Sequence, residues 1–295
     1  MRALHLFFRL HCPYQLRKPS DKITDLNFFG GEDVFREANR TEYQPFFALL
    51  ERNAQKYPNF KISLTVSGPW IEQAQKFDPD LIERLHKLTN LGCVQLLVQP
   101  YYYSLASFYD QDEFKTQIAL HRQKLDQLFG SQTPILALPE LFYNDQIGKW
   151  GEHAGFQGAL AGVMEKQLKW RSVNQVFEAT AHKNFRILCQ NTRLSHAIMH
   201  GWSEATTEEY VTPNQETPTR QDLNPTNGQP NPLNAATAFA QTFKSQQSNK
   251  TPEQSTLQTQ RSFSAKKFQK HLDLELLRGD LINLCIDTAI FRTGR

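Results

Sequence analysis

The stretch that decides the fold is Phe60-Lys61-Ile62-Ser63-Leu64-Thr65-Val66, which alternates with a period of two and stops at Ser67-Gly68-Pro69. Such alternation is typical of a β-strand, and the Ser-Gly-Pro cluster is typical of a break in regular structure. On the N-terminal side, residues 43–57 carry their apolar side chains on one stripe. That spacing predicts a helix with one buried face, leading into the strand.

The same rhythm extends along the chain in both directions. Further strands are predicted at residues 4–10, 93–98, 134–138 and 281–286, and further helices near residues 71–77, 79–91, 113–129, 145–154 and 268–278. Asp78-Pro79 suits a helix start, with Asp78 as the N-cap and proline at the first helical position. Strands separated by helices imply right-handed crossovers and a largely parallel sheet. An α/β barrel and a doubly wound sheet both satisfy this pattern.

Length and composition exclude several classes of protein. The chain has 295 residues with 39% apolar and 12% aromatic side chains, enough for a substantial core in one large domain or two ordinary ones. A net charge of +3 without any run of Lys and Arg argues against a nucleic-acid partner. No apolar stretch approaches the roughly 18–20 residues that span a bilayer, so no membrane partner is expected.

The N-terminus and the cysteines bear on the compartment. The first nine residues place charges on both sides of a short apolar run and lack a small-residue cleavage site, which favours a strand over a secretion signal. The four cysteines, Cys12, Cys93, Cys189 and Cys285, are isolated along the chain. They are interpreted as reduced thiols. A cytoplasmic protein is therefore expected.

Composition changes sharply after residue 205. Residues 206–262 are mostly Thr, Gln, Asn, Pro, Ser and Glu. So little apolar surface cannot offset a backbone ordering cost of roughly 1–2 kcal/mol per residue. The expected organisation is a main α/β part at residues 1–205, a disordered polar insertion at 206–262, and a last helix and strand at 263–295.

Chemically useful side chains follow the predicted strands. The carboxyl ends of the strands are where α/β folds place their sites. The candidates there are His11, Trp70, Tyr101, Tyr102, Glu140 and Asp287. Aromatic rings beside carboxylates suit sugars, and glycosidic-bond cleavage requires two carboxyl groups, about 5–5.5 Å apart in a retaining enzyme.

Each candidate also has an ordinary structural interpretation. Glu140 could be a loop residue or a helix cap, and Asp287 could cap the end of its strand. His11 could be a hydrogen-bonded structural histidine, and the tyrosines could be packing or rim residues. Spacing alone therefore leaves both interpretations open.

Short motifs recur along the whole length of the chain. In chain order they are His11-Cys12-Pro13-Tyr14, Leu64-Thr65-Val66-Ser67-Gly68, Gly92-Cys93-Val94-Gln95-Leu96-Leu97, Tyr101-Tyr102-Tyr103-Ser104-Leu105, Glu140-Leu141-Phe142-Tyr143-Asn144-Asp145, Trp170-Arg171-Ser172, Asn191-Thr192-Arg193-Leu194-Ser195 and Gly279-Asp280-Leu281-Ile282-Asn283-Leu284-Cys285-Ile286-Asp287. Together and in this order they resemble glycoside hydrolase family 57, especially its α-amylase-type members.

The resemblance implies a fold and a mechanism. The fold would be an incomplete (β/α)7 barrel of the glycoside hydrolase and deacetylase type, here without the C-terminal helical domain. Glu140 would be the nucleophile and Asp287 the acid/base group of a retaining enzyme acting on α-1,4-glucans or maltooligosaccharides. His11, Trp70, Tyr101 and Tyr102 would shape the first sugar subsites. No metal and no cofactor are implied.

The chain also departs from the family pattern. Gln95 stands where the family has Glu, Tyr103 where it has His, and Cys12 where it has Gln. His196-Ala197 replaces Asp-Asp, and Asp287 is followed by Thr288-Ala289-Ile290-Phe291 instead of Tyr-Glu-Thr-Phe. A retained carboxylate pair in a changed surround loses positioning, and a shift of about 1 Å can cost on the order of 100-fold in rate.

Three functions are compatible with this pattern. The first is an active hydrolase or transglycosidase of the α-amylase or 4-α-glucanotransferase type. The second is a catalytically impaired α-glucan-binding relative, and the third is a truncated remnant interrupted near Asp287. A metal-dependent polysaccharide deacetylase would need clustered His and Asp ligands. The isolated His11 does not provide such a set.

Overall fold

The structure is a computed structural model that describes most of the chain in two compact units. The described residues are 3–16, 29–130, 134–162, 168, 171–179, 182–200, 265–276, 279 and 281–291. Unit 1 comprises Met1–His5, Val163–Gln175 and Cys189–Ile286, and unit 2 comprises Leu6–Gly162, Val176–Leu188 and Asp287–Arg295. The polar insertion expected at residues 206–262 lies outside the described residues.

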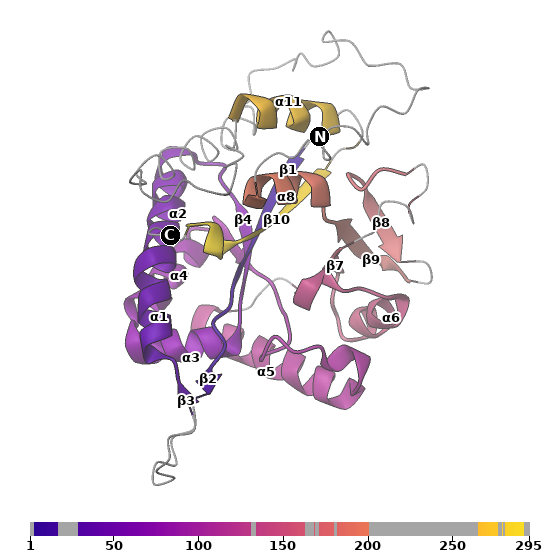
Figure 1. Cartoon of the computed structure of the whole chain (residues 1–295). Coiled ribbons are helices and arrows are strands. Elements are labelled where there is room, and N and C mark those ends of the chain that lie inside the picture. Colours follow the sequence, from indigo (N-terminus) through magenta and orange to yellow (C-terminus); the bar gives the residue numbers. More distant parts are fainter. Residues whose placement is uncertain are drawn as a thin grey trace, which may run out of the picture. The chain divides into compact units, whose positions relative to one another are not determined.

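Unit 2 is built on parallel strands (Figure 1). Strand β1 (Ala3–Leu10) pairs in parallel with β4 (Ile62–Val66), and β4 pairs in parallel with β5 (Val94–Leu96). Residues 7–10 align with residues 63–66. Every residue of β4 is buried. The alternating stretch at 60–66 is thus confirmed as a strand, although both of its faces are covered, as is usual in parallel sheets.

The sheet of unit 2 continues through later strands. A parallel bridge between Val98 and Leu136 leads to β6 (Ile135–Ala137), which pairs in parallel with β7 (Gly158–Ala161). The order there is β6-β7-β9-β8. Strands β9 (His182–Cys189) and β8 (Val176–Ala179) run antiparallel. Strands β7, β8 and β9 were not predicted from the sequence, nor was a short hairpin of β2 (Gln15–Leu16) and β3 (Phe29–Gly30).

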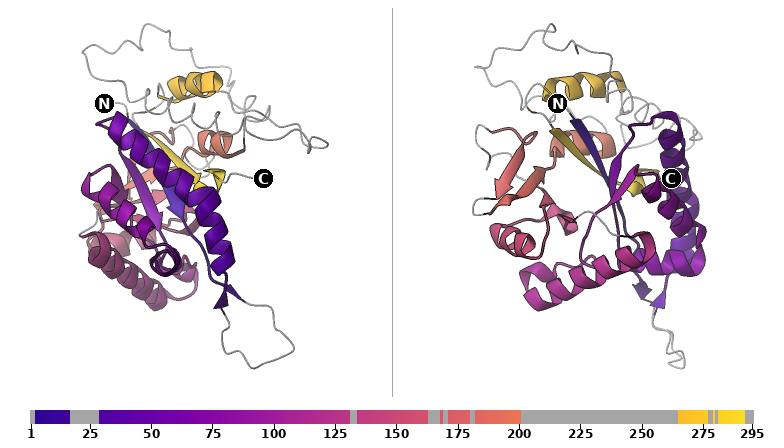
Figure 2. Two further views of the ribbon diagram at one scale, coloured as in Figure 1. Left: turned by 90° about the vertical axis from the view of Figure 1, so that its left-hand side faces the viewer. Right: turned by 180° about the vertical axis from the view of Figure 1, so that it is seen from behind.

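Helices separate the strands of unit 2. They are α1 (Glu32–Ala38), a π-helical turn η1 (Asn39–Tyr43), α2 (Gln44–Lys56), α3 (Gly68–Phe77), α4 (Asp80–Asn90), α5 (Gln111–Phe129) and α6 (Asp145–His153). Figure 2 shows the purple helices of residues 32–90 beside the indigo strand β1. The α/β class predicted from the sequence is confirmed.

Side-chain caps explain where several of these helices begin. The hydroxyl of Ser67 accepts from the backbone N–H of Trp70, and Asp110 and Asn144 cap α5 and α6 in the same way. The predicted cap at Asp78 is wrong, because α4 begins at Asp80 and Pro79 occupies the N-cap. The carboxylate of Asp78 instead accepts hydrogen bonds from Asn39 at 2.5 Å and Gln44 at 3.0 Å.

An aromatic cluster forms part of the core of unit 2. Phe8, Phe46 and Phe291 meet with ring centroids 5.1–6.2 Å apart. All three are nearly or fully buried. Each buried phenylalanine contributes roughly 1.5–3 kcal/mol. Because Phe8 lies in β1 and Phe291 follows Asp287, this packing fixes the strand ends that carry the candidate site.

Unit 1 is held together by a buried polar network. It contains α8 (Thr192–His200), α11 (Ala265–Leu276) and most of β10 (Leu281–Asp287). Glu275 forms an ion pair with Arg193 and accepts hydrogen bonds from Asn174 at 2.6 Å and Asn191 at 3.3 Å. The Asn191 side chain also accepts from the backbone N–H of Leu194 at 2.9 Å, which caps α8.

Two further observations bear on the sequence-based expectations. All four cysteines are buried, and no disulfide joins them. Among the helices that the structure describes, none has the length and apolar character needed to cross a membrane.

Candidate active site

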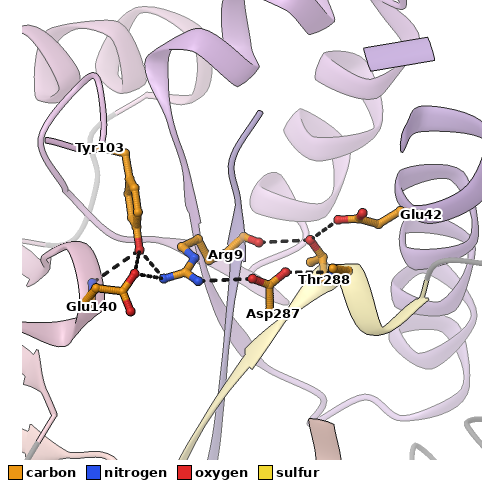
Figure 3. Close-up of polar contacts among 7 residues, drawn as sticks. Arg9, Glu42, Tyr103, Glu140, Asp287 and Thr288 are labelled. Carbon is orange, nitrogen blue, oxygen red and sulfur yellow. Dashed lines mark hydrogen bonds and ion pairs between the residues drawn. The ribbon is translucent and has the colours of Figure 1, made fainter. Parts of the chain in front are cut away.

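The two predicted catalytic carboxylates of unit 2 meet at one arginine. Glu140 lies in a 3₁₀ turn, η3 (Pro139–Leu141), directly after β6, and Asp287 is the last residue of β10. Arg9, near the end of β1, reaches both: Nη1 is 3.6 Å from Glu140 Oε1, and Nη2 is 3.1 Å from Asp287 Oδ2. Figure 3 shows the guanidinium between the two carboxylates. A guanidinium is only a few ångströms across, so the carboxylates lie within reach of one sugar ring.

Tyr103 completes the contact on the Glu140 side. Its hydroxyl donates to Glu140 Oε1 at 3.2 Å and accepts from the Glu140 backbone N–H at 3.3 Å. Arg9 donates a hydrogen bond to the same hydroxyl, and its guanidinium carbon lies 5.0 Å from the ring centroid. Burial raises the pKa of Tyr103 to about 12. The phenol therefore stays protonated at neutral pH and serves as a donor to Glu140.

The backbone at this point adopts an unusual conformation. Glu140 has φ 52° and ψ 19°, and Leu141 and Tyr103 have φ of 53° and 58°. Residues other than glycine rarely enter this left-handed region, and each such residue costs about 1–3 kcal/mol. The surrounding hydrogen bonds hold it: Gly162 N–H donates to the Leu141 carbonyl at 2.7 Å, and Tyr103 N–H donates to the Pro100 carbonyl at 2.9 Å. Backbone strain of this kind clusters at functional sites.

The Asp287 side of the site is anchored by the residues that follow it. Asp287 Oδ1 accepts from the backbone N–H of Ala289 at 2.8 Å. Thr288 Oγ1 lies 3.0 Å from the Arg9 carbonyl oxygen and 2.6 Å from Glu42 Oε1. Glu42 is only 4% exposed and belongs to the π-helical turn η1, a type of turn that is frequent at functional sites. These contacts hold Arg9 and Asp287 in place together.

His11 lies beside Tyr103, at the end of β1. Its Nδ1 is 2.8 Å from the Ser67 hydroxyl, and its ring centroid is 4.7 Å from that of Tyr103. Burial lowers the pKa of His11, and the positive charge of Arg9 lowers it further. A neutral imidazole in this position can form hydrogen bonds but is a poor proton donor at neutral pH.

Tyr101 and Tyr102 are brought together, but only one of them is exposed. Tyr102 is 53% exposed, and its ring meets that of Tyr101 edge-on at 4.9 Å. Tyr101 is 4% exposed, and its hydroxyl donates to Glu72 at 2.5 Å. A side chain at Gly68 would overlap the Tyr101 ring, so glycine at the start of α3 allows this close packing. Tyr101 therefore supports the exposed ring of Tyr102.

Trp70 has a position different from the expected one. Its side chain is fully buried, with Phe47 stacked at 6.4 Å and Tyr43 edge-on at 5.7 Å between ring centroids. A tryptophan without exposed surface cannot stack on a sugar. Trp70 therefore packs inside unit 2 and cannot contact a ligand directly.

The positions of Arg9 and Glu42 and the role of Tyr103 were not predicted from the sequence. Arg9 could have been noticed as the one charged side chain inside the apolar run at residues 4–10, close to its carboxyl end. Tyr103 was noted only as a departure from a family pattern. Glu42 gave no signal, because it lies in a helical stretch far from any predicted strand end.

The described residues do not form a metal-binding cluster. In the part of the chain that the structure describes, no group of three or more His, Cys, Asp or Glu side chains is placed to hold a metal ion. The arrangement that is present consists of two carboxylates, a guanidinium and a phenol. Such a set suits general acid/base and nucleophilic chemistry at a sugar.

Comparisons of sequence connect the chain to known enzymes. The model of glycosyl hydrolase family 57 matches residues 4–264. A protein of Methanocaldococcus jannaschii provisionally named an alpha-amylase is 28% identical over 212 residues, which are 69% of this chain and 44% of that protein. The 4-alpha-glucanotransferase of Thermococcus litoralis is 24% identical over 145 residues, 46% of this chain and 21% of that protein. The chain thus spans less than half the length of these relatives.

Comparisons of structure agree on the fold. A family 57 branching enzyme of Pyrococcus horikoshii matches 98% of this chain with a TM-score of 0.59 at 13% identity, over 64% of that enzyme. The 4-alpha-glucanotransferase of Thermococcus litoralis matches 99% of this chain with a TM-score of 0.54 at 15% identity, over 34% of that enzyme. The family model covers most of the residues and the fold agrees with it, so the chain belongs to glycosyl hydrolase family 57.

Proposed function

We propose that this chain is a retaining glycoside hydrolase or transglycosidase that acts on α-1,4-glucans such as maltooligosaccharides. The observation that carries the proposal is the meeting of Glu140 and Asp287 at Arg9, at the carboxyl ends of strands that lie far apart in the sequence. Two carboxylates close enough to share one cation are close enough to act on one glycosidic bond.

Glu140 is proposed as the nucleophile. Its side chain is 73% exposed, and the hydroxyl of Tyr103 and the guanidinium of Arg9 both face Oε1. Among the described residues, no hydrogen bond or ion pair engages Oε2, so one oxygen remains available to attack an anomeric carbon. Attack would form a glycosyl-enzyme ester that water or an acceptor sugar then cleaves.

Asp287 is proposed as the acid/base group. In a retaining mechanism this group protonates the departing oxygen and later takes a proton from the incoming water or sugar. Its side chain is 45% exposed, so a substrate can reach it. Tyr102 and His11 are proposed to contact the sugars, because Tyr102 is exposed and His11 lies beside Tyr103.

The names of the relatives support the substrate class. They include an alpha-amylase of Pyrococcus abyssi, which matches 46% of this chain, and the 4-alpha-glucanotransferase already described. Hydrolysis and transfer share the first chemical step and differ in the acceptor of the second.

Chromatography of the products formed from maltotetraose tests the proposal. The wild-type chain is expected to form shorter maltooligosaccharides by hydrolysis, or both shorter and longer ones by transfer, and Glu140→Gln is expected to form neither while keeping the fold. Glu37→Gln is the matched control, because Glu37 is 61% exposed and its side chain pairs with the surface residue Arg40. Equal activity in the wild type and in Glu140→Gln would refute the proposal.

A second candidate is a glucan-binding relative with impaired catalysis. The specific observation that favours it is the guanidinium of Arg9, which contacts both reacting groups. Calorimetric titration with maltoheptaose distinguishes the two functions. Binding without any Glu140-dependent turnover supports the second candidate, and turnover rejects it.

A further inference from the structure

A run of exposed apolar side chains follows Tyr103 along the chain. Leu105 is 46% exposed, Phe108 is 49% exposed and Tyr109 is 90% exposed. Single exposed apolar residues are ordinary on protein surfaces, but a group of them within one short segment is typical of a binding surface. The proposed site uses none of these three side chains, so their exposure calls for a separate explanation.

This segment contacts the turn that carries the proposed nucleophile. Inside the site, the Tyr103 hydroxyl donates to Glu140 Oε1 at 3.2 Å (Figure 3). Further along both segments, the ring of Phe108 meets the ring of Phe142, which follows Glu140 by two residues, with centroids 3.9 Å apart. The two segments therefore touch once in the site and once beyond it. The exposed rings are continuous with the site.

Hydrogen bonds hold the exposed rings on an ordered turn. In the 3₁₀ turn η2 (Ala106–Phe108), the Ala106 carbonyl accepts from the backbone N–H groups of Tyr109 at 3.0 Å and of Asp110 at 2.8 Å. The Asp110 carboxylate then caps α5 by accepting from the N–H groups of residues 112 and 113, each at 3.0 Å. A surface that is ordered before it binds loses little conformational entropy on binding.

We propose that Phe108 and Tyr109, backed by Phe142, form an outer sugar subsite that holds a glucose unit of an α-glucan beyond the unit at Glu140. The inference rests on the glucan substrate of the proposed function and adds a determinant of chain length to it. An aromatic ring presents a flat apolar face to the C–H groups on one side of a pyranose. The Tyr109 side chain is almost fully exposed, so its hydroxyl is accessible to a sugar hydroxyl.

The size of the exposed group favours a saccharide over a protein partner. A stable protein interface buries about 800 Å² on each partner and involves about 20–30 residues a side. Leu105, Phe108 and Tyr109 are far below that scale, whereas one aromatic ring matches one pyranose. The exposed carboxylates of Asp112 and Glu113 follow directly in the sequence and can accept hydrogen bonds from sugar hydroxyls.

The ratio of kcat/KM for maltoheptaose to kcat/KM for maltotriose tests the inference in the full chain. The wild type should favour maltoheptaose, because the longer chain extends beyond the reacting bond to the outer subsite. Phe108→Ala should lower this ratio about fivefold, which is the scale of one aromatic contact. The loss should appear in KM, because the subsite does not touch the reacting atoms. Leu91→Ala is the matched control, since Leu91 is 73% exposed and follows α4, and it should leave the ratio unchanged.

Two further measurements keep the test decisive. Phe108→Leu keeps an apolar side chain against Phe142 and takes the place of Phe108→Ala if the latter does not fold. Calorimetric titration with maltoheptaose measures the same contact without turnover. The affinity of Glu140→Gln should fall about fivefold when Phe108→Ala is added to it, and it should not change when Leu91→Ala is added.

The outcomes separate this inference from the proposed function. With turnover that depends on Glu140, an unchanged ratio in the Phe108 variant, or an equal loss on maltotriose and maltoheptaose, overturns the inference alone. Turnover that is absent or independent of Glu140 overturns the proposed function, and the titrations then decide the inference. Equal affinities with and without Phe108→Ala overturn it, and a change in oligomeric state with unchanged sugar affinity assigns the rings to a protein contact instead.

Discussion

Two of the networks that arginine and carboxylate side chains form among the described residues differ in how completely the carboxylates are enclosed. In unit 1 the Arg193 and Glu275 side chains are 10% and 3% exposed, and Asn174 and Asn191 donate to the same carboxylate. In unit 2 the Arg9, Glu140 and Asp287 side chains are 28%, 73% and 45% exposed. The same chemical groups therefore form a buried structural network in one unit and an accessible site in the other.

This difference has a physical basis. A charge taken out of water must be matched by partners, or it destabilises the fold by several kcal/mol. Glu275 meets that requirement with its ion pair and two amide donors. Glu140 is largely hydrated and keeps Oε2 without a described partner, so it can exchange water for substrate at little cost. We therefore expect mutations in the Glu275 network to lower the free energy of unfolding, and mutations in the Arg9 network to lower the rate of turnover.

The largest expected effect is on turnover at the open network. Glu140→Gln removes the proposed nucleophile and should lower the rate with α-maltosyl fluoride by about 10³-fold or more. Because the side chain is exposed, the unfolding free energy should change by less than about 1 kcal/mol. Fluoride release and urea unfolding measure the two quantities. A loss of stability as large as the loss of activity would contradict the contrast between the networks.

The next effect is on stability at the closed network. Glu275→Ala removes the carboxylate that pairs with the buried Arg193 and should destabilise the chain by about 3–5 kcal/mol. Urea unfolding measures this change, and Glu178→Ala is the exposed control, since Glu178 is 53% exposed and pairs with Arg186. A double variant, Arg193→Met with Glu275→Met, should recover part of the loss, because it leaves no unpaired charge. A cost below about 1 kcal/mol for Glu275→Ala would show that the network is not structural.

Acid should lower the free energy of unfolding through His121 of unit 2. His121 is fully buried, its Nδ1 accepts from the Gln99 N–H at 3.3 Å, and its Nε2 lies 2.7 Å from the Val66 carbonyl. Burial lowers its pKa from 6.5 to about 4. The unfolded chain therefore binds the proton more tightly, so stability is full above about pH 6.5 and falls as the pH drops toward 4, by up to about 3 kcal/mol.

Unfolding at pH 7 and pH 5 in His121→Gln measures this contribution. The difference in unfolding free energy between the two pH values should shrink in His121→Gln and stay unchanged in His86→Gln, whose imidazole lies on the surface. An equal pH dependence in both variants and the wild type would assign the acid sensitivity to other groups.

The smallest effect is expected at the phenol. Tyr103→Phe removes the hydroxyl that bonds to Glu140 and Arg9 but keeps the ring beside His11. The rate with α-maltosyl fluoride should fall about tenfold, since a lost hydrogen bond to a charged group is worth about 1.5–3 kcal/mol and water can replace part of it. Steady-state kinetics measures this change. A rate equal to that of the wild type would show that the Tyr103 hydroxyl does not contribute to turnover.

The strand ends of the site could be predicted from sequence. The apolar runs that became β1, β4, β5, β6 and β10 are short, and breakers or polar residues end them, so their carboxyl ends were visible. Glu140 follows β6, Asp287 ends β10, and both carboxylates contact Arg9. The antiparallel strands β8 and β9 were missed. In β8 exposed residues outnumber buried ones, so the strand gives little apolar signal. In β9 the alternation of exposed Asn184 and Arg186 with buried Phe185 and Ile187 is a period-two signal that was overlooked.

Side-chain details could not be predicted. Whether an aromatic residue after a strand faces solvent depends on which helices cover it, and α2 together with the π-helical turn buries Trp70 while Tyr102 stays exposed. The left-handed conformations of Glu140 and Tyr103 arise from tertiary contacts, which no local propensity encodes. The reach of Arg9 to both carboxylates likewise depends on a long side chain and on two strands distant in sequence.

Covalent trapping of the glycosyl-enzyme is the most direct test of the account. The chain would be incubated with 5-fluoro-α-glucosyl fluoride, and intact mass and peptide mapping would follow. The account predicts a single added fluoroglucosyl group on Glu140 in the wild type and none in Glu140→Gln. An unlabelled wild type, or a label on another carboxylate that persists in Glu140→Gln, would contradict it.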